Sequence, residues 1–89
     1  MSINKTLSAL SDEICRKILM KLKEEKINTG NLAVSLGITP QALSYHLAKL
    51  KKADLIYETK NKNFIYYGIN LSVLDEVILW VNNLKDEEK

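Results

Sequence analysis

The residues best suited to chemistry lie in the stretch TPQALSYHLAKLKK at positions 39–52. On a helix, Leu43, Leu47 and Leu50 form one apolar seam, and polar, small or cationic side chains occupy the other faces. Glutamine can pair with adenine, serine and tyrosine can bond bases or phosphates, and lysine neutralises phosphates. We therefore expect DNA contacts from the following residues: Thr39, Gln41, Ala42, Ser44, Tyr45, His46, Lys49 and Lys52.

A second basic segment, Lys60-Asn61-Lys62-Asn63, separates two stretches rich in β-branched and aromatic residues. Asparagine tolerates left-handed backbone, so the segment is predicted to be a hairpin turn. Its tip would bring Lys60, Lys62 and Asn63 to the DNA backbone or minor groove. Charge supports this interpretation, because residues 39–63 carry five lysines against two acids, whereas residues 71–89 carry two lysines against five acids.

Other chemistry is poorly supported. The chain has one cysteine, Cys15, and one histidine, His46, and they fall on different predicted helices, whereas a metal site needs three or four suitably spaced ligands. No metal site and no cofactor are therefore predicted. Cys15 falls on an apolar helix face and is interpreted as a small buried hydrophobe, with a redox-sensing thiol as the alternative. The absence of a nucleophile–base pair and of a phosphate-binding glycine loop argues against an enzyme.

The elements that position these residues follow from caps and periodicity. Helices are predicted over residues 4–10 and, after an N-cap at Ser11, over 12–25. A short helix capped by Asn28 or Thr29 ends at Gly37, and Thr39 with Pro40 then starts a helix that runs to about Lys52. Two short helices joined by a glycine-containing turn predict a helix-turn-helix at 29–52, followed by a β-wing at 55–69.

The last predicted helix, capped by Ser72 and covering residues 72–85, is too apolar for one buried stripe. Its excess apolar surface, together with the first helix, predicts a homodimer built on these residues: Leu7, Leu10, Leu74, Val77, Ile78, Trp80, Val81 and Leu84. The whole chain is expected to form a single domain, mostly α with a small β-hairpin, in the order α-α-α-α-β-β-α. Because no apolar run reaches the ~18 residues of a membrane span and the start lacks a signal-peptide core, we expect a cytoplasmic protein without membrane insertion.

The stretches LSDEICRKILMKL, LAVSLGITPQALSYHLAKLKKADLI and FIYYGI together resemble the ArsR/SmtB family of winged-helix repressors, and within it the SdpR-type autorepressors, which lack a metal site. The resemblance implies a homodimer joined through the first and last helices. It also implies that the helix from Pro40 enters the major groove, with Gln41, Ser44 and Tyr45 at the DNA. The dimer would bind a pseudo-palindromic operator and block transcription.

Metal-sensing members of that family carry a cysteine pair in the first helix of the helix-turn-helix, or His/Asp clusters on the last helix. Here the first of these regions reads TGNLAVSLG, and the last helix has no histidine, so regulation is expected to be independent of metal. Relief of repression could then come from a regulatory protein partner, from oxidation of Cys15 or from a small molecule. The alternative function is a winged helix that binds proteins and does not contact DNA directly.

Overall fold

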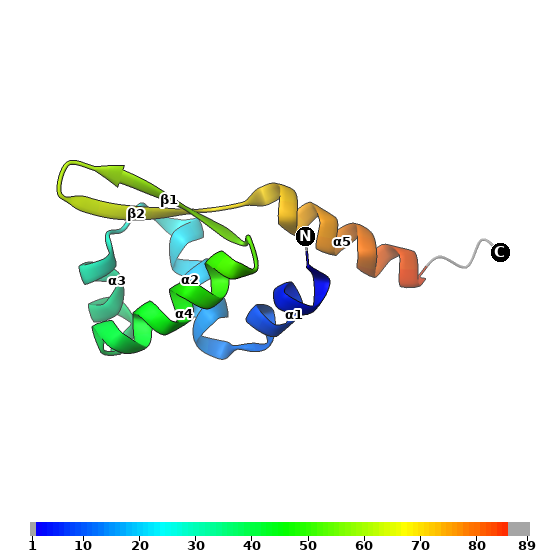
Figure 1. Cartoon of the computed structure of the whole chain (residues 1–89), viewed down its shortest axis with the longest axis horizontal. Helices are drawn as coiled ribbons and strands as arrows, with labels where there is room; N and C mark the ends of the chain where they lie inside the picture. The colour runs from blue at the N-terminus through cyan, green and yellow to red at the C-terminus, as the bar shows by residue number, and fades with distance from the viewer. Residues whose placement is uncertain (1, 86–89) are drawn as a thin grey trace.

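The computed structural model describes residues 2–85 and contains five helices and one β-hairpin (Figure 1). The elements are α1 (Ile3–Ser11), α2 (Glu13–Glu24), α3 (Thr29–Leu36), α4 (Pro40–Lys52), β1 (Ile56–Asn61), β2 (Phe64–Ile69) and α5 (Leu71–Lys85). This order confirms the predicted mostly helical winged helix-turn-helix, in which α3 and α4 form the two-helix unit and the β1–β2 hairpin forms the wing.

The core lies where α1 to α4 meet the start of the hairpin. Its largest fully buried apolar side chains come from four separate segments and are Ile18, Leu32, Leu50 and Leu55. The predicted seam of α4 is confirmed, because Leu43, Leu47 and Leu50 are all buried. One buried polar contact joins α1 to the C-terminal end of α4, since the Thr6 hydroxyl on α1 donates to the carbonyl oxygen of Ala53 at 3.4 Å.

The ends of α3 and α4 are those that the sequence predicts. Gly37 ends α3 in the left-handed region, with φ of 67°, and the Asn28 side chain caps the start of that helix by accepting from the Asn31 N–H at 2.9 Å. Thr39 Oγ1 accepts from the Ala42 N–H at 3.0 Å, and Pro40 is the first residue of α4. The turn between the two helices is therefore determined by local chemistry.

Two predicted caps are wrong. Ser11 is the last residue of α1, and Asp12 caps α2 instead, because its carboxylate accepts from both the Ile14 and the Cys15 N–H groups. The fifth helix begins at Leu71, so Ser72 lies inside its first turn. At the start of α2, two neighbouring residues could serve as the cap, and Asp12 does so.

The wing is an antiparallel pair whose register runs from Ile56 opposite Ile69 to Asn61 opposite Phe64. Its turn needs a left-handed residue, as expected, but Lys62 adopts that conformation, with φ of 57°, and neither asparagine does. The hairpin lies along α3 and α4 with its turn at the end of the molecule opposite α5 (Figure 1). The two lysines at its tip are therefore held at one extremity of the described chain.

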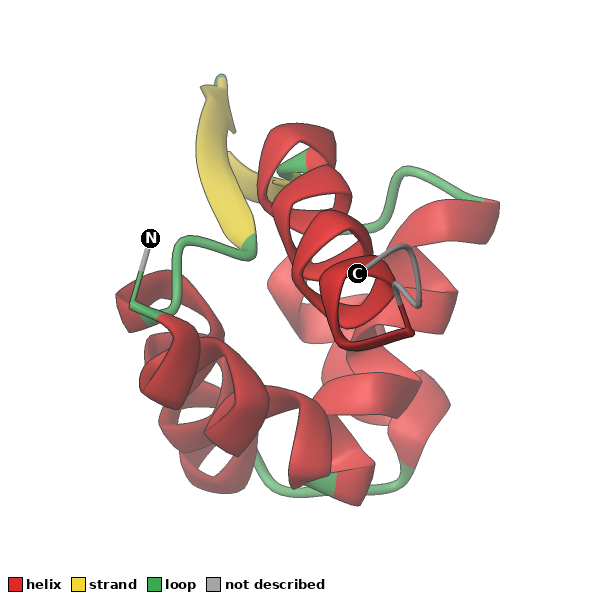
Figure 2. Ribbon diagram, turned by 90° about the vertical axis from the view of Figure 1, so that its right-hand side faces the viewer, coloured by secondary structure: helices red, strands yellow, loops and turns green. Residues whose placement is uncertain are grey.

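Helix α5 projects away from the remaining helices, and the molecule is elongated, with extents of 53 × 23 × 21 Å (Figure 1). Val73 is the only buried residue among those described in α5. Figure 2 views the molecule from the side of α5, with this helix in front of the others, and most of the described residues of α5 are exposed. None of the described helices combines the length and the apolar character needed to cross a membrane.

Candidate nucleic-acid interface

The face of α4 opposite its leucine seam is exposed and carries four of the residues predicted to meet DNA. Exposed positions on this helix include Gln41, Ser44, Tyr45, Ala48 and Lys52. Tyr45 is 64% exposed although it is a large aromatic residue, so packing within the chain does not account for it. The helix therefore presents hydrogen-bonding groups around a small residue, Ala48, which would let the backbone approach a groove floor.

The wing tip presents the second group of predicted residues. Lys60, Lys62 and Asn63 are exposed, and the left-handed Lys62 lies in the turn itself. Lys51, which was not among the predicted residues, donates to the Glu58 carboxylate at 2.9 Å and joins α4 to β1. That contact raises the pKa of the Lys51 ammonium through the hydrogen bond and the charge of Glu58. The wing is thereby connected to the helix whose exposed face it flanks.

An open groove of about 480 Å³ separates α3, α4 and β2. Val34, Ser44, Ala48 and Ile65 are among its lining residues, so it contains two positions of the exposed α4 face. Sequence reasoning missed this groove because its walls come from three elements, and no local pattern records their approach. The groove gives the surface formed by α4 and the wing a concave shape.

Two of the residues predicted to contact DNA point elsewhere. The His46 side chain is 18% exposed and Lys49 is 29% exposed, and both approach Asp12 at the start of α2. Thr39 is exposed at the helix start, where its hydroxyl is occupied as the cap, and Ala42 is half-buried. The structure thus presents Gln41, Ser44, Tyr45 and Lys52 together, and directs His46 and Lys49 toward the helix packed behind them.

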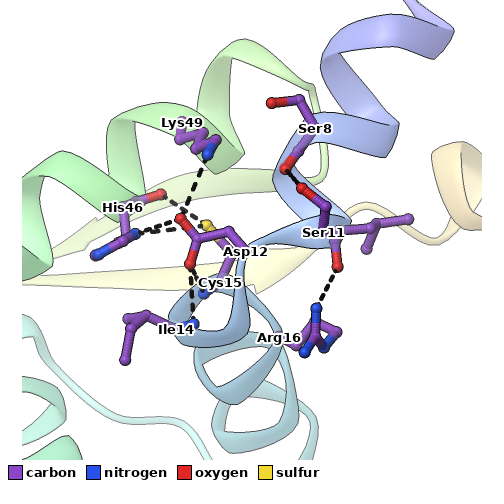
Figure 3. A network of polar contacts seen from close by, with 9 residues as sticks. Ser8, Ser11, Asp12, Ile14, Cys15, Arg16, His46 and Lys49 are labelled. Atoms are coloured by element: carbon purple, nitrogen blue, oxygen red, sulfur yellow. Dashed lines mark hydrogen bonds and ion pairs between the residues drawn. The ribbon is translucent and has the colours of Figure 1, made fainter.

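Asp12, Cys15, His46 and Lys49 form a polar cluster between α2 and α4 (Figure 3). Asp12 Oδ2 lies 2.8 Å from His46 Nδ1 and 3.4 Å from Lys49 Nζ. Cys15 Sγ lies 3.9 Å from His46 Nδ1 and donates to the His46 carbonyl oxygen at 3.6 Å. Among residues 2–85 this is also a place where three metal-ligating side chains converge, with the donor atoms of Asp12, Cys15 and His46 all within 4.8 Å of one another.

The cluster shifts the pKa values of two of its members. Burial would raise the pKa of Asp12, but the Cys15 N–H together with His46 and Lys49 outweighs it and holds that pKa below its ordinary value. Burial raises the pKa of the Cys15 thiol to about 11, and the Asp12 carboxylate adds to the increase. The isolated thiol is therefore protonated near neutral pH, which argues against a freely reactive redox sensor.

Cys15 and His46 were predicted to share no site because they fall on different helices, but their side chains lie 3.9 Å apart. They belong to different helices, as predicted, but the crossing of α2 and α4 brings their side chains together. The sequence does place Asp12 and Cys15 three positions apart at one helix start. It contains no local signal for His46, which is 31 residues beyond Cys15 and reaches it only through the fold.

The apolar residues predicted for a dimer interface differ in how far the chain itself covers them. Leu7 on α1 and four residues of α5 are exposed, namely Ile78, Trp80, Val81 and Leu84. Val77 is half-buried, while Leu10 and Leu74 pack against the core of their own chain. Leu71 and Leu79 are exposed as well and were not among the predicted residues. The unpartnered apolar surface is therefore concentrated on α5.

Comparison with known proteins gives a consistent result. Residues 12–58 match the family model described as "Bacterial regulatory protein, arsR family". The chain is 37% identical to the transcriptional repressor SdpR of Bacillus subtilis, over 91% of this chain and 90% of that protein. It is 27% identical to the transcriptional activator HlyU of Vibrio cholerae, over 88% of this chain and 72% of that protein. An ArsR-like transcriptional regulator from Rhodococcus has a similar structure, with a TM-score of 0.88 and 25% identity, over 93% of this chain and 76% of that one.

Proposed function

Because the chain belongs to the ArsR family of bacterial regulatory proteins, and is thus a DNA-binding transcription regulator and no enzyme, we propose that it is a repressor that binds a pseudo-palindromic operator as a homodimer. The observation that carries the proposal is the exposed face of α4. Gln41, Ser44 and Tyr45 are exposed and lie beside a basic wing. The Tyr45 ring makes an edge-to-face contact with the His46 ring, with centroids 5.0 Å apart, but still remains 64% exposed. This arrangement suits a helix that enters the major groove while the wing follows the backbone.

The side chains on this surface suggest which residues would read bases and which would bind phosphates. Gln41, Ser44 and Tyr45 carry donors and acceptors that can read base edges. Lys52, Lys60 and Lys62 are exposed cations suited to phosphates, which supply affinity but no sequence information. We expect Lys49 to contribute less to DNA binding than the sequence predicts, because its ammonium already pairs with Asp12. His46 is assigned to the cluster behind the helix.

Repression and dimerisation are supported separately. The relative with 37% identity over nearly the whole chain is a repressor, whereas the activator among the relatives is less similar. Homodimers are typical of the ArsR family, and the exposed apolar residues of α5 are the surface that a second copy would cover. A two-fold dimer places its recognition helices about 34 Å apart, or a multiple of that distance, on an operator with matching symmetry.

The sequence predicted regulation that is independent of metal, in part because the two positions used by metal-sensing members of the family lack their ligands here. Helix α3 contains no cysteine, and α5 contains no histidine. We therefore propose no metal regulation through α3 or α5. The alternative of a winged helix that binds only proteins is set aside, because the family is one of DNA-binding regulators. A protein partner that relieves repression is compatible with the proposal.

The proposal is tested by titrating the protein onto the intergenic DNA upstream of its own gene, with a scrambled duplex of equal length as the competitor. We expect specific binding whose logarithmic affinity falls linearly with the logarithm of salt concentration. The double substitution Lys52→Ala and Lys62→Ala removes four lysines from the dimer, so it should reduce affinity for both duplexes and make the salt slope shallower by about 4.

The matched control is Lys17→Ala, which removes the same charge from the exposed surface of α2, where Lys17 pairs with Glu13 at 3.4 Å. This variant should bind both duplexes nearly as the wild type does. The assignment of this surface is wrong if the wild-type protein binds neither duplex at low salt. It is also wrong if Lys17→Ala weakens binding as much as the double substitution does.

A further inference from the structure

We propose that Asp12, Cys15 and His46 form a binding site for a Zn²⁺-like cation that joins α2 to α4 (Figure 3). The ligands would be Cys15 Sγ, His46 Nδ1 and Asp12 Oδ2, with a water molecule in the fourth position. The site lies in neither α3 nor α5, and it could bind an ion whether or not the protein binds DNA.

The spacing of the donor atoms is close to what a tetrahedral ion requires. Around zinc, metal–nitrogen and metal–oxygen bonds of about 2.0 Å and a metal–sulfur bond of about 2.3 Å put neighbouring donors roughly 3.3–3.7 Å apart. Here the nitrogen–oxygen distance between His46 and Asp12 is 2.8 Å, and the sulfur–nitrogen distance between Cys15 and His46 is 3.9 Å. These two separations would each need to change by about 0.5 Å or less, and the donor atoms of all three residues already lie within 4.8 Å of one another.

The chemistry of the donors selects the class of ion. A thiolate and an imidazole favour zinc and its spectroscopic substitute cobalt over magnesium or calcium, which prefer oxygen ligands alone. One thiolate and one carboxylate neutralise a divalent charge, so the occupied site carries no net charge. An ion with one sulfur, one nitrogen and one oxygen ligand also retains an open coordination position.

The fold holds two of the three ligands before any ion arrives. Asp12 Oδ1 is held by the Ile14 and Cys15 N–H groups at 2.9 and 3.1 Å, which leaves Oδ2 directed at His46. Cys15 is fixed in the core at 0% exposure, three residues along the same helix. The ion would therefore bind partly preorganised ligands, and the cap of α2 would not have to be broken.

A metal ion would enter the cluster from its outer side, where it would also compete with the Lys49 ammonium for Asp12. Asp12 is 12% exposed and His46 is 18% exposed, so an ion can enter from solvent past these two side chains. The Lys49 ammonium, 3.4 Å from Asp12 Oδ2, is the competing cation in the empty cluster. Its flexible stem lets the charge swing out to water when a metal neutralises the carboxylate.

Binding involves no change of oxidation state. The metal forms bonds to sulfur, nitrogen and oxygen, the Cys15 thiol releases its proton to solvent, and His46 binds as the neutral ring with its proton on Nε2. Asp12 binds as the carboxylate that it already is. Zn²⁺ remains Zn²⁺ throughout, and one proton leaves for each thiol converted to thiolate.

The test uses the untagged full-length protein and Co²⁺ as the probe. Because the chain has one cysteine and one histidine, a thiolate-to-cobalt charge-transfer band can arise only from Cys15. We expect one Co²⁺ per chain and the intense visible bands of four-coordinate cobalt. Added Zn²⁺ should remove both the charge-transfer band and these visible bands. X-ray absorption of the zinc form should show a single sulfur at about 2.3 Å with histidine in the first shell.

Three variants and one control define the ligands. Cys15→Ser should abolish the charge-transfer band, and His46→Gln should weaken Co²⁺ binding by at least about tenfold. Asp12→Asn retains an oxygen that can cap α2 but removes the charge, and should weaken binding similarly. The control Glu13→Gln removes an exposed carboxylate beside the cluster and should leave binding unchanged. Circular dichroism establishes that each variant is folded before it is compared.

Three results would overturn the proposal. The first is a wild-type spectrum without a charge-transfer band at saturating Co²⁺. The second is equal Co²⁺ affinity in the wild type, His46→Gln and Asp12→Asn. The third is a stoichiometry of two chains per ion that depends on Cys15 alone, which would indicate thiolates from separate molecules. The spectrum of the wild type needs no substitution, so the test remains decisive even if a variant fails to fold.

Discussion

At the scale of single residues, Asp12 combines two roles that are usually separate. One carboxylate oxygen caps α2 through two backbone N–H groups, and the other faces His46 and Lys49 on α4. The same side chain therefore starts one helix and fixes its crossing with the next. The cluster holds α4 from behind the exposed face that Gln41 and Tyr45 present, so it positions the surface proposed to contact DNA without belonging to that surface.

The two roles of Asp12 can be separated by substitution. Asp12→Ala removes both and should lower the free energy of unfolding by about 1–2 kcal/mol, the upper part of the range for a lost cap. Asp12→Asn keeps a side-chain oxygen for the Ile14 and Cys15 N–H groups and should cost clearly less. Urea denaturation followed by circular dichroism measures both values. Equal losses would mean that the charge facing α4, and not the cap, supplies most of the stabilisation.

A second residue-scale prediction distinguishes base reading from phosphate binding. Gln41→Ala should weaken operator binding by about 1–3 kcal/mol while leaving affinity for scrambled DNA nearly unchanged. Lys62→Ala, at the wing tip of both protomers, should weaken binding to both DNAs alike and reduce the salt slope by about 2. Fluorescence anisotropy at several salt concentrations measures both effects. If Gln41→Ala weakens both DNAs equally, Gln41 contacts the backbone instead of a base.

At the scale of elements, local chemistry explains why α3 and α4 could be predicted so closely. Asn28, Gly37, Thr39 and Pro40 each act on the backbone within a few residues, so the sequence contains the whole signal. Errors arose where two neighbouring residues could serve equally, as with Ser11 and Asp12 at the start of α2. The approach of His46 to Cys15 could not be predicted, because it depends on how two helices cross.

The turn between α3 and α4 offers a test of this local determination. Gly37 has φ of 67°, and an added Cβ would meet nothing within 4 Å, so Gly37→Ala suffers backbone strain alone. We expect it to lower the free energy of unfolding by about 1–2 kcal/mol. Gly30→Ala is the matched control, since Gly30 lies in α3 without positive φ and its added Cβ would make an ordinary contact at 3.5 Å with the Asn28 side chain.

Gly30→Ala should leave stability unchanged or raise it by up to about 1 kcal/mol, because alanine favours the helix. Thermal and urea denaturation of the two variants, measured side by side, give the difference. Comparable losses in both would show that glycine is needed in α3 for packing or flexibility, and that the left-handed conformation at Gly37 is not the decisive factor.

At the scale of the whole molecule, the described chain separates its two surfaces. The wing tip lies at one end and α5 projects at the other, so a partner bound to α5 would not cover the exposed face of α4 (Figure 1). The surplus of apolar residues on α5 was visible in the sequence, because composition alone shows that one stripe cannot hold them. Which of them remain uncovered was not, since Leu74 packs on the core whereas Leu79 is exposed.

Trp80 provides the test at this scale. It is 40% exposed on α5, and a large aromatic residue in such a position is a typical anchor of an interface. Trp80→Ala should raise the dimer dissociation constant by about 30-fold or more, which corresponds to a hot-spot loss of at least about 2 kcal/mol. Sedimentation velocity over a series of protein concentrations measures the shift from dimer to monomer.

The control for Trp80 is Phe64→Ala, because Phe64 is another exposed aromatic residue but lies on β2 beside the wing turn. It should leave the dimer unchanged, since no dimer contact is assigned to the wing. Operator binding adds a second measurement: a monomeric Trp80→Ala protein that keeps its fold should bind a single half-site as before and lose the extra affinity of two half-sites on one DNA. A wild-type protein that sediments as a monomer at every concentration would remove α5 as the interface and, with it, the need for a symmetric operator.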